Sequence, residues 1–427
     1  MKLLCEKVKK LLKNGFLHVF GSSVLNKIIS FLSSVVLVRI LTKSEYGVFT
    51  YAWNVYSIVL LFNGMGMESA ILQLCSERSG DESYAQRVCN FGTRFGVLFN
   101  VLLTVVMLGI ALFAPLTIEK SRSLLALLCL LPMIQLLFNL STSYLRSQKR
   151  NQDFSVLSTV NTALVFFVSV GAALAFREKG MVFGYYIAYA CSALIGAFKM
   201  RIRLFSRTKP LEQQDKKALL SIGAVSMCNN GLSQLLYLLG VFILGIVVAD
   251  ETVLASYKTA TLIPTALNFI PSALVIYLYP YFAEHRDDGD WCMKRYKQVL
   301  VGLGTLNAVI SLVLVIGAPL IIKILFGLQY LDAVPVFRVL AINFFFSGTF
   351  QVLAGNLLVT QRKLQYNLLV ALISGVINIV TNLLFVQWWG SMGAAIATIV
   401  VVLIASALNV SYLVHIFAQK SNNKKSS

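Results

Sequence analysis

The sequence contains few charged residues and very few acidic ones. Only 13% of its 427 residues are Asp, Glu, Lys or Arg and 57% are hydrophobic, whereas soluble domains carry about 25% charged residues. This composition excludes a soluble globular protein and predicts a polytopic membrane protein. The three histidines and seven cysteines form no CxxC pair and no Cys/His cluster. We therefore expect no disulfide framework, no metal site and no cofactor.

Apolar segments long enough to cross a bilayer occur twelve times, six on either side of a basic linker. The sequence thus predicts an all-α protein with twelve transmembrane helices. The predicted spans are 16–41, 46–67, 91–116, 123–145, 154–176 and 180–199, followed by 218–248, 254–280, 299–325, 334–360, 366–388 and 392–417.

The basic residues indicate how the chain is oriented. The net charge is +19, but the Lys and Arg residues sit in short clusters between apolar segments, which is the pattern of the positive-inside rule and not of nucleic-acid binding. The termini and even-numbered loops hold 26 of them and the odd-numbered loops hold 7. We expect both termini in the cytoplasm. Residues 1–14 are a basic topology anchor in this interpretation, or alternatively a short amphipathic helix.

The longest polar connection lies at the middle of the chain, and the outward loops are all short. This predicts two six-helix lobes, residues 1–208 and 209–427, which would be related by an axis along the membrane normal and would rock to give alternating access. A weak similarity between segments 42–52 and 249–260 supports an internal repeat. Short outward loops leave no room for a catalytic domain, so we expect no enzyme activity.

Polar stripes run along the first two spans of each half. In segment 254–280, Lys258, Thr261, Thr265, Asn268 and Ser272 follow at steps of three and four and share one helical face. Such a stripe either faces a hydrated cavity or is buried between helices, with the lysine extending to an interface. We interpret it as a cavity wall. The predicted polar lining comprises Asn26, Ser30, Asn54, Asn230, Ser233, Thr261, Thr265 and Asn268.

Cations without acidic partners are the most informative feature of the spans. Lys27 and Lys258 lie within predicted spans and Arg39 lies at an outward end, whereas the acidic residue nearest a span centre, Glu68, is expected at a span end. Isolated cations are expensive in hydrocarbon. They fit a hydrated cavity whose cargo is anionic, such as a phosphate or diphosphate. The alternative is hydrogen bonding to backbone carbonyls.

Three ordered segments resemble one transporter family. They are the turn RILTKSEYGVF (39–49), the stretch from Gly317-Ala-Pro-Leu to Gly327-Leu-Gln-Tyr330 with its continuation 333–340, and Asn378 and Asn382 followed by GSMGAAIAT (390–398). They are similar to motifs of the Wzx-type O-antigen flippases, which belong to the multidrug/oligosaccharidyl-lipid/polysaccharide exporter superfamily. The motif glycines, Gly47, Gly327, Gly390 and Gly393, are expected to serve turns and close packing.

This resemblance implies a MATE-like, two-lobed bundle in a bacterial cytoplasmic (inner) membrane. It implies translocation of an undecaprenyl-diphosphate-linked oligosaccharide to the outer leaflet, and the polysaccharide polymerase machinery as a partner. The cationic site would comprise Lys27, Arg39 and Lys258. Two departures stand out: Gly240 where many members carry Asp, which puts cation coupling there in doubt, and Gln387-Trp388-Trp389 where a proline is frequent.

Three other interpretations compete with the flippase, and one of them, a transporter of an unrelated fold, is opposed by the three ordered motifs. A cation-coupled multidrug exporter of the same superfamily requires acidic groups near the membrane centre, and the predicted spans offer none there. A membrane polymerase or ligase requires a sizeable outward loop. The energy source of a flippase stays open among a proton gradient, a sodium gradient and consumption of the product, because no P-loop motif occurs.

Overall fold

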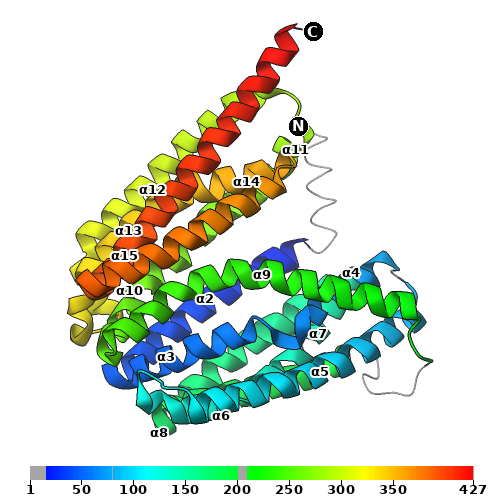
Figure 1. Cartoon of the computed structure of the whole chain (residues 1–427), viewed down its shortest axis with the longest axis vertical. Helices are drawn as coiled ribbons and strands as arrows, with labels where there is room; N and C mark the ends of the chain where they lie inside the picture. Colours follow the sequence, from blue (N-terminus) through cyan, green and yellow to red (C-terminus); the bar gives the residue numbers. More distant parts are fainter. Residues whose placement is uncertain (1–15, 79, 201–208, 427) are drawn as a thin grey trace. The chain divides into compact units, whose positions relative to one another are not determined.

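The computed structural model describes residues 16–78, 80–200 and 209–426, and these residues form helices without any strand (Figure 1). The N-terminal segment 1–14 lies outside them. Packing divides the chain into two compact units, the first ending at Leu238 and the second beginning at Leu239. Helix α9 (Gln213–Val248) therefore contributes to both units.

Among its described residues, the first unit contains seven α-helices and two short 3-10 helices before α9. They are α2 (Phe16–Ile40), α3 (Lys43–Leu60), the short η1 (Asn63–Gly66), α4 (Met67–Glu77), α5 (Glu82–Phe113), η2 (Glu119–Ser121) with α6 (Arg122–Leu128), α7 (Leu131–Ser147) and α8 (Asn151–Met200). Its core lies between α4, α5, α7 and the start of α9, and includes Met67, Ile71, Leu136, Tyr144 and Leu219.

The second unit begins with the end of α9 and contains the rest of the chain. Its elements are α10 (Glu251–Leu267), α11 (Phe269–Glu284), α12 (Gly289–Leu325), η3 (Leu328–Ala333), α13 (Val334–Phe346), the π-helix η4 (Ser347–Gln351), α14 (Val352–Thr360) and α15 (Leu364–Ser426). Its core lies between α11, α12, α14 and α15, and includes Phe282, Tyr296, Leu353, Leu357 and Phe417.

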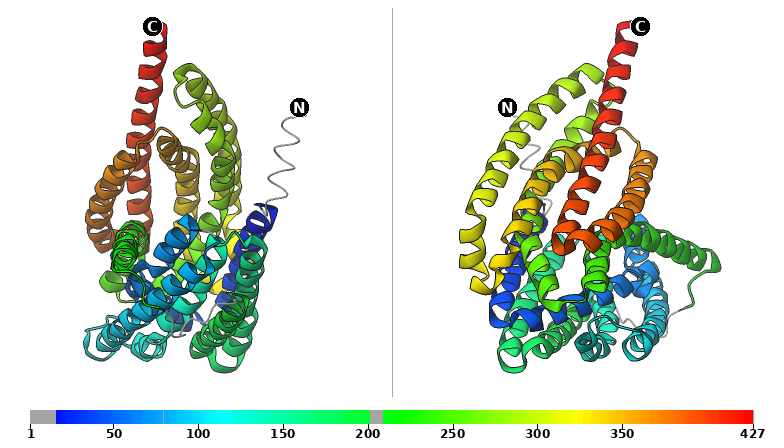
Figure 2. Two further views of the ribbon diagram at one scale, coloured as in Figure 1. Left: turned by 90° about the vertical axis from the view of Figure 1, so that its right-hand side faces the viewer. Right: turned by 60° about the vertical axis from the view of Figure 1, so that its left-hand side comes forward.

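The longest helices, α8 and α15, each double back on themselves. The backbone leaves helical geometry at Phe176 and Arg177 in α8 and at Gly390 in α15. A Cβ atom at Gly184 would overlap the backbone of Ser169, because the two segments of α8 lie against each other. The orange and red segments of α15 run antiparallel in the same way (Figures 1 and 2). Gly390 has a φ of 54°, which favours glycine at this turn.

Two predicted continuous spans are broken helices. The second span contains a run of left-handed residues, Gly64, Met65 and Gly66, between α3 and α4. The eighth span is divided into α10 and α11 at Asn268. Pro271 explains this second break, because its ring displaces the carbonyl of residue 267 and it has no N–H to donate.

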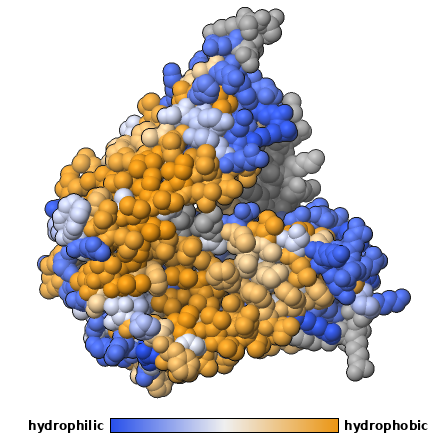
Figure 3. All heavy atoms as spheres, in the orientation of Figure 1, coloured by the Kyte–Doolittle hydropathy of each residue, from blue (hydrophilic) through white to orange (hydrophobic). Residues whose placement is uncertain are grey.

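Eight helices among the described residues are long and apolar enough to cross a membrane, or nine if the bent pair Glu119–Leu128 and Leu131–Ser147 forms one span. Large apolar side chains such as Leu98, Val105, Val309 and Ile316 are exposed on α5 and α12. Figure 3 shows apolar residues over the middles of the helices and hydrophilic residues at their ends. The chain is a multi-pass membrane protein. The number twelve stays a prediction.

Candidate functional site

Lys27 and Asn26 lie on α2, which packs along α8. The Lys27 side chain is exposed, and its ammonium group has no hydrogen bond or ion pair within the described residues. Asn26 is half-buried, and its Nδ2 donates to Ser158 Oγ on α8 over 2.9 Å, while its Oδ1 is buried without a hydrogen-bond partner. Ser30 is exposed. The stripe of the first span thus has one residue that joins two helices and two that are accessible.

Arg39 is exposed at the C-terminal end of α2, one turn before α3 begins. The turn after Arg39 explains why the motif RILTKSEYGVF carries an acidic residue, Glu45. Glu45 accepts a hydrogen bond from the Thr42 N–H over 2.8 Å, and Thr42 Oγ1 accepts one from the Glu45 N–H. This capping box satisfies two free N–H groups at the start of α3. Arg177, at the break in α8, donates to the Ile40 carbonyl and holds the same turn.

Asn54 lies on α3 and is buried, with 6% of its surface exposed. Its Nδ2 donates to the Leu238 carbonyl of α9 over 3.3 Å, and its Oδ1 is buried without a partner. Two residues further, the Tyr56 hydroxyl donates to Gln135 Oε1 on α7 over 2.5 Å. The polar residues of α3 therefore bond neighbouring helices within the first unit.

Lys258 lies on α10 in the second unit and is half-buried. Its ammonium group has no hydrogen bond or ion pair within the described part of the chain. Thr261 is half-buried and donates back to the Lys258 carbonyl over 2.7 Å, while Thr265 is exposed. Asn268 is half-buried at the α10–α11 break, and its Oδ1 is buried without a partner. Lys258, Thr261 and Thr265 thus share α10, where Lys258 is an unpaired cation, and their role as a cavity wall stays a prediction.

Two predicted lining residues lie on α9. Asn230 is exposed, and the side chain of Ser233 lies outside the described residues. Lys27 and Arg39 belong to the first unit and Lys258 to the second. Their common cavity stays a prediction. Among the described residues, no group of three His, Cys, Asp or Glu side chains could hold a metal ion.

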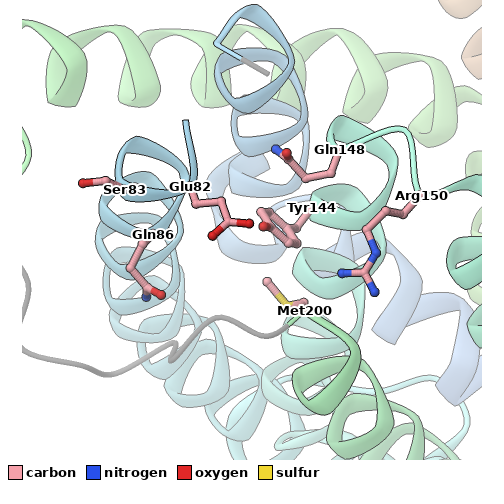
Figure 4. Close-up of a pocket in the computed structure, with 7 residues that line it drawn as sticks. All are labelled: Glu82, Ser83, Gln86, Tyr144, Gln148, Arg150 and Met200. Carbon is pink, nitrogen blue, oxygen red and sulfur yellow. The ribbon is translucent and has the colours of Figure 1, made fainter. Parts of the chain in front are cut away.

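Sequence reasoning missed a polar pocket at one end of the first unit (Figure 4). Its volume is about 610 Å³. The residues that line it come from the start of α5, the end of α7, the loop after α7 and the end of α8. They are Glu82, Ser83, Gln86, Tyr144, Gln148, Arg150 and Met200. No motif connects the three sequence segments that hold them, 82–86, 144–150 and the end of α8. The sequence feature that could have indicated the pocket is the concentration of Gln, Glu and Arg residues at the ends of predicted spans.

An ion pair holds one wall of this pocket in place. Arg150 donates from Nε over 3.0 Å and from Nη2 over 2.8 Å to Asp153 Oδ2, and Lys199 pairs with the other oxygen of the same carboxylate. On the opposite wall, the Glu82 carboxylate has no hydrogen-bond partner among the described residues. Figure 4 shows the Tyr144 side chain between Glu82 and Arg150. The pocket thus has one fixed cation and one free anion.

A family model described as "Polysaccharide biosynthesis protein" matches residues 36–335. No curated protein sequence matches. An inward-facing MATE multidrug resistance transporter of the MOP superfamily is similar with a TM-score of 0.75 at 14% identity, covering 93% of this chain and 96% of that one.

Two further solved structures have the same fold. The lipid II flippase MurJ, in an inward closed conformation, has a TM-score of 0.74 at 13% identity, covering 95% of this chain and 90% of that one. A MOP-superfamily transporter from Pyrococcus furiosus, whose binding pocket is described as having reverse polarity, has a TM-score of 0.60 at 11% identity, with 96% of each chain covered. The chain therefore belongs to the polysaccharide biosynthesis protein family, and its fold is that of the MOP-superfamily transporters.

Proposed function

We propose that this protein is a flippase that moves an undecaprenyl-diphosphate-linked oligosaccharide, an O-antigen or similar repeat unit, from the cytoplasmic to the outer leaflet. The family match to polysaccharide biosynthesis proteins over residues 36–335 supports a glycan cargo. The shared fold with a drug transporter and a lipid flippase supports transport over catalysis. Its translocated product would pass to the polysaccharide polymerase machinery.

The observation that carries the proposal is the unpaired cation of α10. Lys258 is half-buried in a candidate membrane span and has no carboxylate or hydrogen-bond partner among the described residues. A charged group in that position is expensive unless water or an opposite charge accompanies it. A diphosphate supplies that charge and also accepts hydrogen bonds from an ammonium group. Lys27, exposed and equally unpaired on α2, would make the first contact, and Arg39 would lie on the exit side.

The proposed architecture has twelve spans in two six-helix lobes. Nine spans follow from length and composition when the bent pair counts as one. The return segments of α8 and α15, which begin after Arg177 and Gly390, add two, and α9 adds the twelfth. An even number places both termini on the same face, and the distribution of Lys and Arg favours the cytoplasm. We expect this membrane to be a bacterial inner membrane.

The alternative is a cation-coupled multidrug exporter. It is favoured by the similarity to MATE transporters and by Glu68, a half-buried carboxylate in the first turn of α4. An exporter of organic cations would use such carboxylates to bind its substrate. The unpaired lysines argue against it, because like charges in a binding cavity repel a cationic drug.

Deletion of the gene in its own host distinguishes the two functions. For a flippase, surface glycan is lost and its lipid-linked precursor accumulates on the cytoplasmic leaflet, as measured by glycan electrophoresis and by enzymatic accessibility of the precursor in oriented vesicles. Normal glycan together with increased sensitivity to cationic drugs would instead establish the exporter.

Substitution of the two lysines tests the site. We expect Lys27→Ala and Lys258→Ala each to reduce surface glycan about tenfold or more at normal protein level, because a charge-assisted hydrogen bond is lost. Lys258→Arg keeps the charge and should retain part of the activity. Lys323→Ala is the matched control, since Lys323 is an exposed lysine at the end of α12. Wild-type glycan in both alanine variants contradicts the site.

A further inference from the structure

The pocket at the end of the first unit combines polar groups of several kinds with an aromatic ring. Tyr144 and Met200 are almost fully buried and form its apolar part. Around them lie a carboxylate, two carboxamides, a hydroxyl and a guanidinium group, from Glu82, Gln86, Gln148, Ser83 and Arg150. Figure 4 shows Glu82, Tyr144 and Arg150 extending into the same space.

Several hydrogen-bonding groups of the pocket are unused. The Glu82 carboxylate and the Tyr144 hydroxyl have no hydrogen-bond partner among the described residues. Arg150 uses Nε and Nη2 for Asp153, which leaves Nη1 available. Ser83 Oγ accepts from Arg87 over 2.7 Å and can still donate. The pocket therefore offers both donors and acceptors, and its guanidinium group is held in a fixed orientation.

This set of groups limits the class of ligand. A simple anion would be repelled by the free Glu82 carboxylate, and a simple cation by Arg150. A metal ion would find a single carboxylate. An apolar ligand would leave the Glu82 carboxylate and the Tyr144 hydroxyl without hydrogen-bond partners, which is unfavourable. A polyhydroxylated neutral ligand matches the donors and the acceptors of the pocket alike, because each sugar hydroxyl both donates and accepts hydrogen bonds.

The volume and the position agree with this ligand. About 610 Å³ lies within the range of roughly 300–1,000 Å³ that small-molecule sites occupy. The pocket lies where α5 begins and where α7 and α8 end, which are positions that the charge distribution assigns to the cytoplasmic face. The saccharide of a lipid-linked precursor is on that face before translocation.

We propose that this pocket binds the saccharide part of the lipid-linked substrate on the cytoplasmic side, before the diphosphate engages the lysines. The proposal rests on the flippase function and adds a sugar-recognition site to it. Glu82, Gln148 and the Tyr144 hydroxyl bind sugar hydroxyls. The other ligand that suits one cation and one anion, a zwitterionic phospholipid headgroup, is tested as a competitor.

The experiment measures binding of the free oligosaccharide. The full-length protein is reconstituted in nanodiscs of phosphatidylglycerol, and the probe is the oligosaccharide released by mild acid from the host's own lipid-linked precursor. Saturation-transfer NMR and calorimetry give the affinity. The pocket variant is Glu82→Gln combined with Gln148→Ala. The matched control is Glu178→Gln combined with Gln387→Ala, which changes an accessible carboxylate and an exposed carboxamide at the breaks of α8 and α15.

We expect the pocket variant to bind the oligosaccharide about tenfold more weakly or worse, since hydrogen bonds to a charged group are lost, and the control to bind as wild type. Equal thermal unfolding of both variants excludes misfolding. Unchanged affinity in the pocket variant overturns the proposal, and so does displacement of the probe by phosphatidylethanolamine in the nanodisc.

The gene deletion and the binding measurement together distinguish a failure of the sugar pocket from a failure of the proposed flippase function. Precursor trapped by gene deletion, together with unchanged oligosaccharide affinity in the pocket variant, refutes the sugar pocket and leaves the flippase intact. Unchanged precursor distribution after deletion refutes the flippase, whatever the pocket binds. Lys27→Ala with Lys258→Ala should leave the affinity for the phosphate-free oligosaccharide unchanged, and a parallel loss there would contradict a separate sugar site.

Discussion

Asn100 holds the break between α3 and α4 through a single side chain. It is fully buried on α5. Its Oδ1 accepts from the Gly64 N–H over 2.8 Å, and its Nδ2 donates to Asn63 Oδ1 over 2.6 Å and to the Pro132 carbonyl over 2.9 Å. Backbone groups that leave a helix inside a membrane protein have no water to bond. The Asn100 side chain provides the hydrogen bonds that water would otherwise make.

Replacement of this side chain should therefore be costly. We expect Asn100→Ala to lower the free energy of unfolding by about 2–3 kcal/mol, because it leaves the Gly64 N–H buried without a partner. The measurement is thermal unfolding of the purified protein in detergent. Asn356→Ala is the control, since Asn356 is exposed and bonds only the Val352 carbonyl one turn earlier in its own helix. Equal destabilisation in both variants would refute this role for Asn100.

For single residues, the sequence periodicity predicted on which helix a polar side chain lies, but it did not predict which residue that side chain bonds. Spacing placed Lys258 and Thr261 on one helical face, and the two lie one turn apart on α10, where the Lys258 ammonium group is unpaired. Spacing could not show that Asn54 bonds α9 or that Asn26 bonds Ser158, because these partners are 184 and 132 residues away in the sequence. The pocket escaped detection for the same reason.

At the level of elements, the α3–α4 break also depends on two glycines. Gly66 has a φ of 70°, and a Cβ atom there would overlap the carbonyl oxygen of Gly223 on α9. The start of α9 can therefore pass directly over the break. A left-handed residue with a Cβ is strained by about 1–2 kcal/mol even without a neighbour.

We expect Gly66→Ala to destabilise the protein by more than about 2 kcal/mol, because left-handed strain adds to a backbone overlap. Gly109→Ala serves as the control: Gly109 is inside α5, and a Cβ there meets no atom within 4 Å. That change should be neutral or stabilising by about 0.5–1 kcal/mol. Thermal unfolding of the pair provides the readout. A stable Gly66→Ala protein would show that α9 can move away from the break.

The sequence predicted the helices well where the length of an apolar segment defines a span, and poorly where the chain bends within a span. Hydropathy located the spans of the candidate helices, and Gly390 was expected in a turn. The sequence did not predict the bend at Met65, because a methionine with a φ of 49° has no sequence signature. The bend depends on the hydrogen bond from Gly64 to Asn100 and on the packing of α9 against Gly66. Arg177, with a φ of 53°, likewise depends on a tertiary contact to the end of α2.

At the level of the whole molecule, the proposed orientation places the sugar pocket on the loading side. Lys149 and Lys179 are exposed near opposite ends of the first segment of α8. In a background without native cysteines, we expect an impermeant maleimide to label Lys179→Cys in intact cells and Lys149→Cys only after the membrane is opened. The reverse labelling would place the pocket outside the cell and contradict its role in capturing the precursor.

The division of α9 between the two units affects how members of this family can recombine. The predicted lobe boundary at residue 208 precedes α9, but α9 remains in the first unit up to Leu238 and lies against the α3–α4 break there. A chimera of two relatives joined at residue 208 would give the first unit an α9 shaped for another protein. Crossovers after residue 238 keep Gly66 with the Gly223 that evolved beside it. Natural mosaic genes should therefore show their junctions inside α9 rather than in the linker before it.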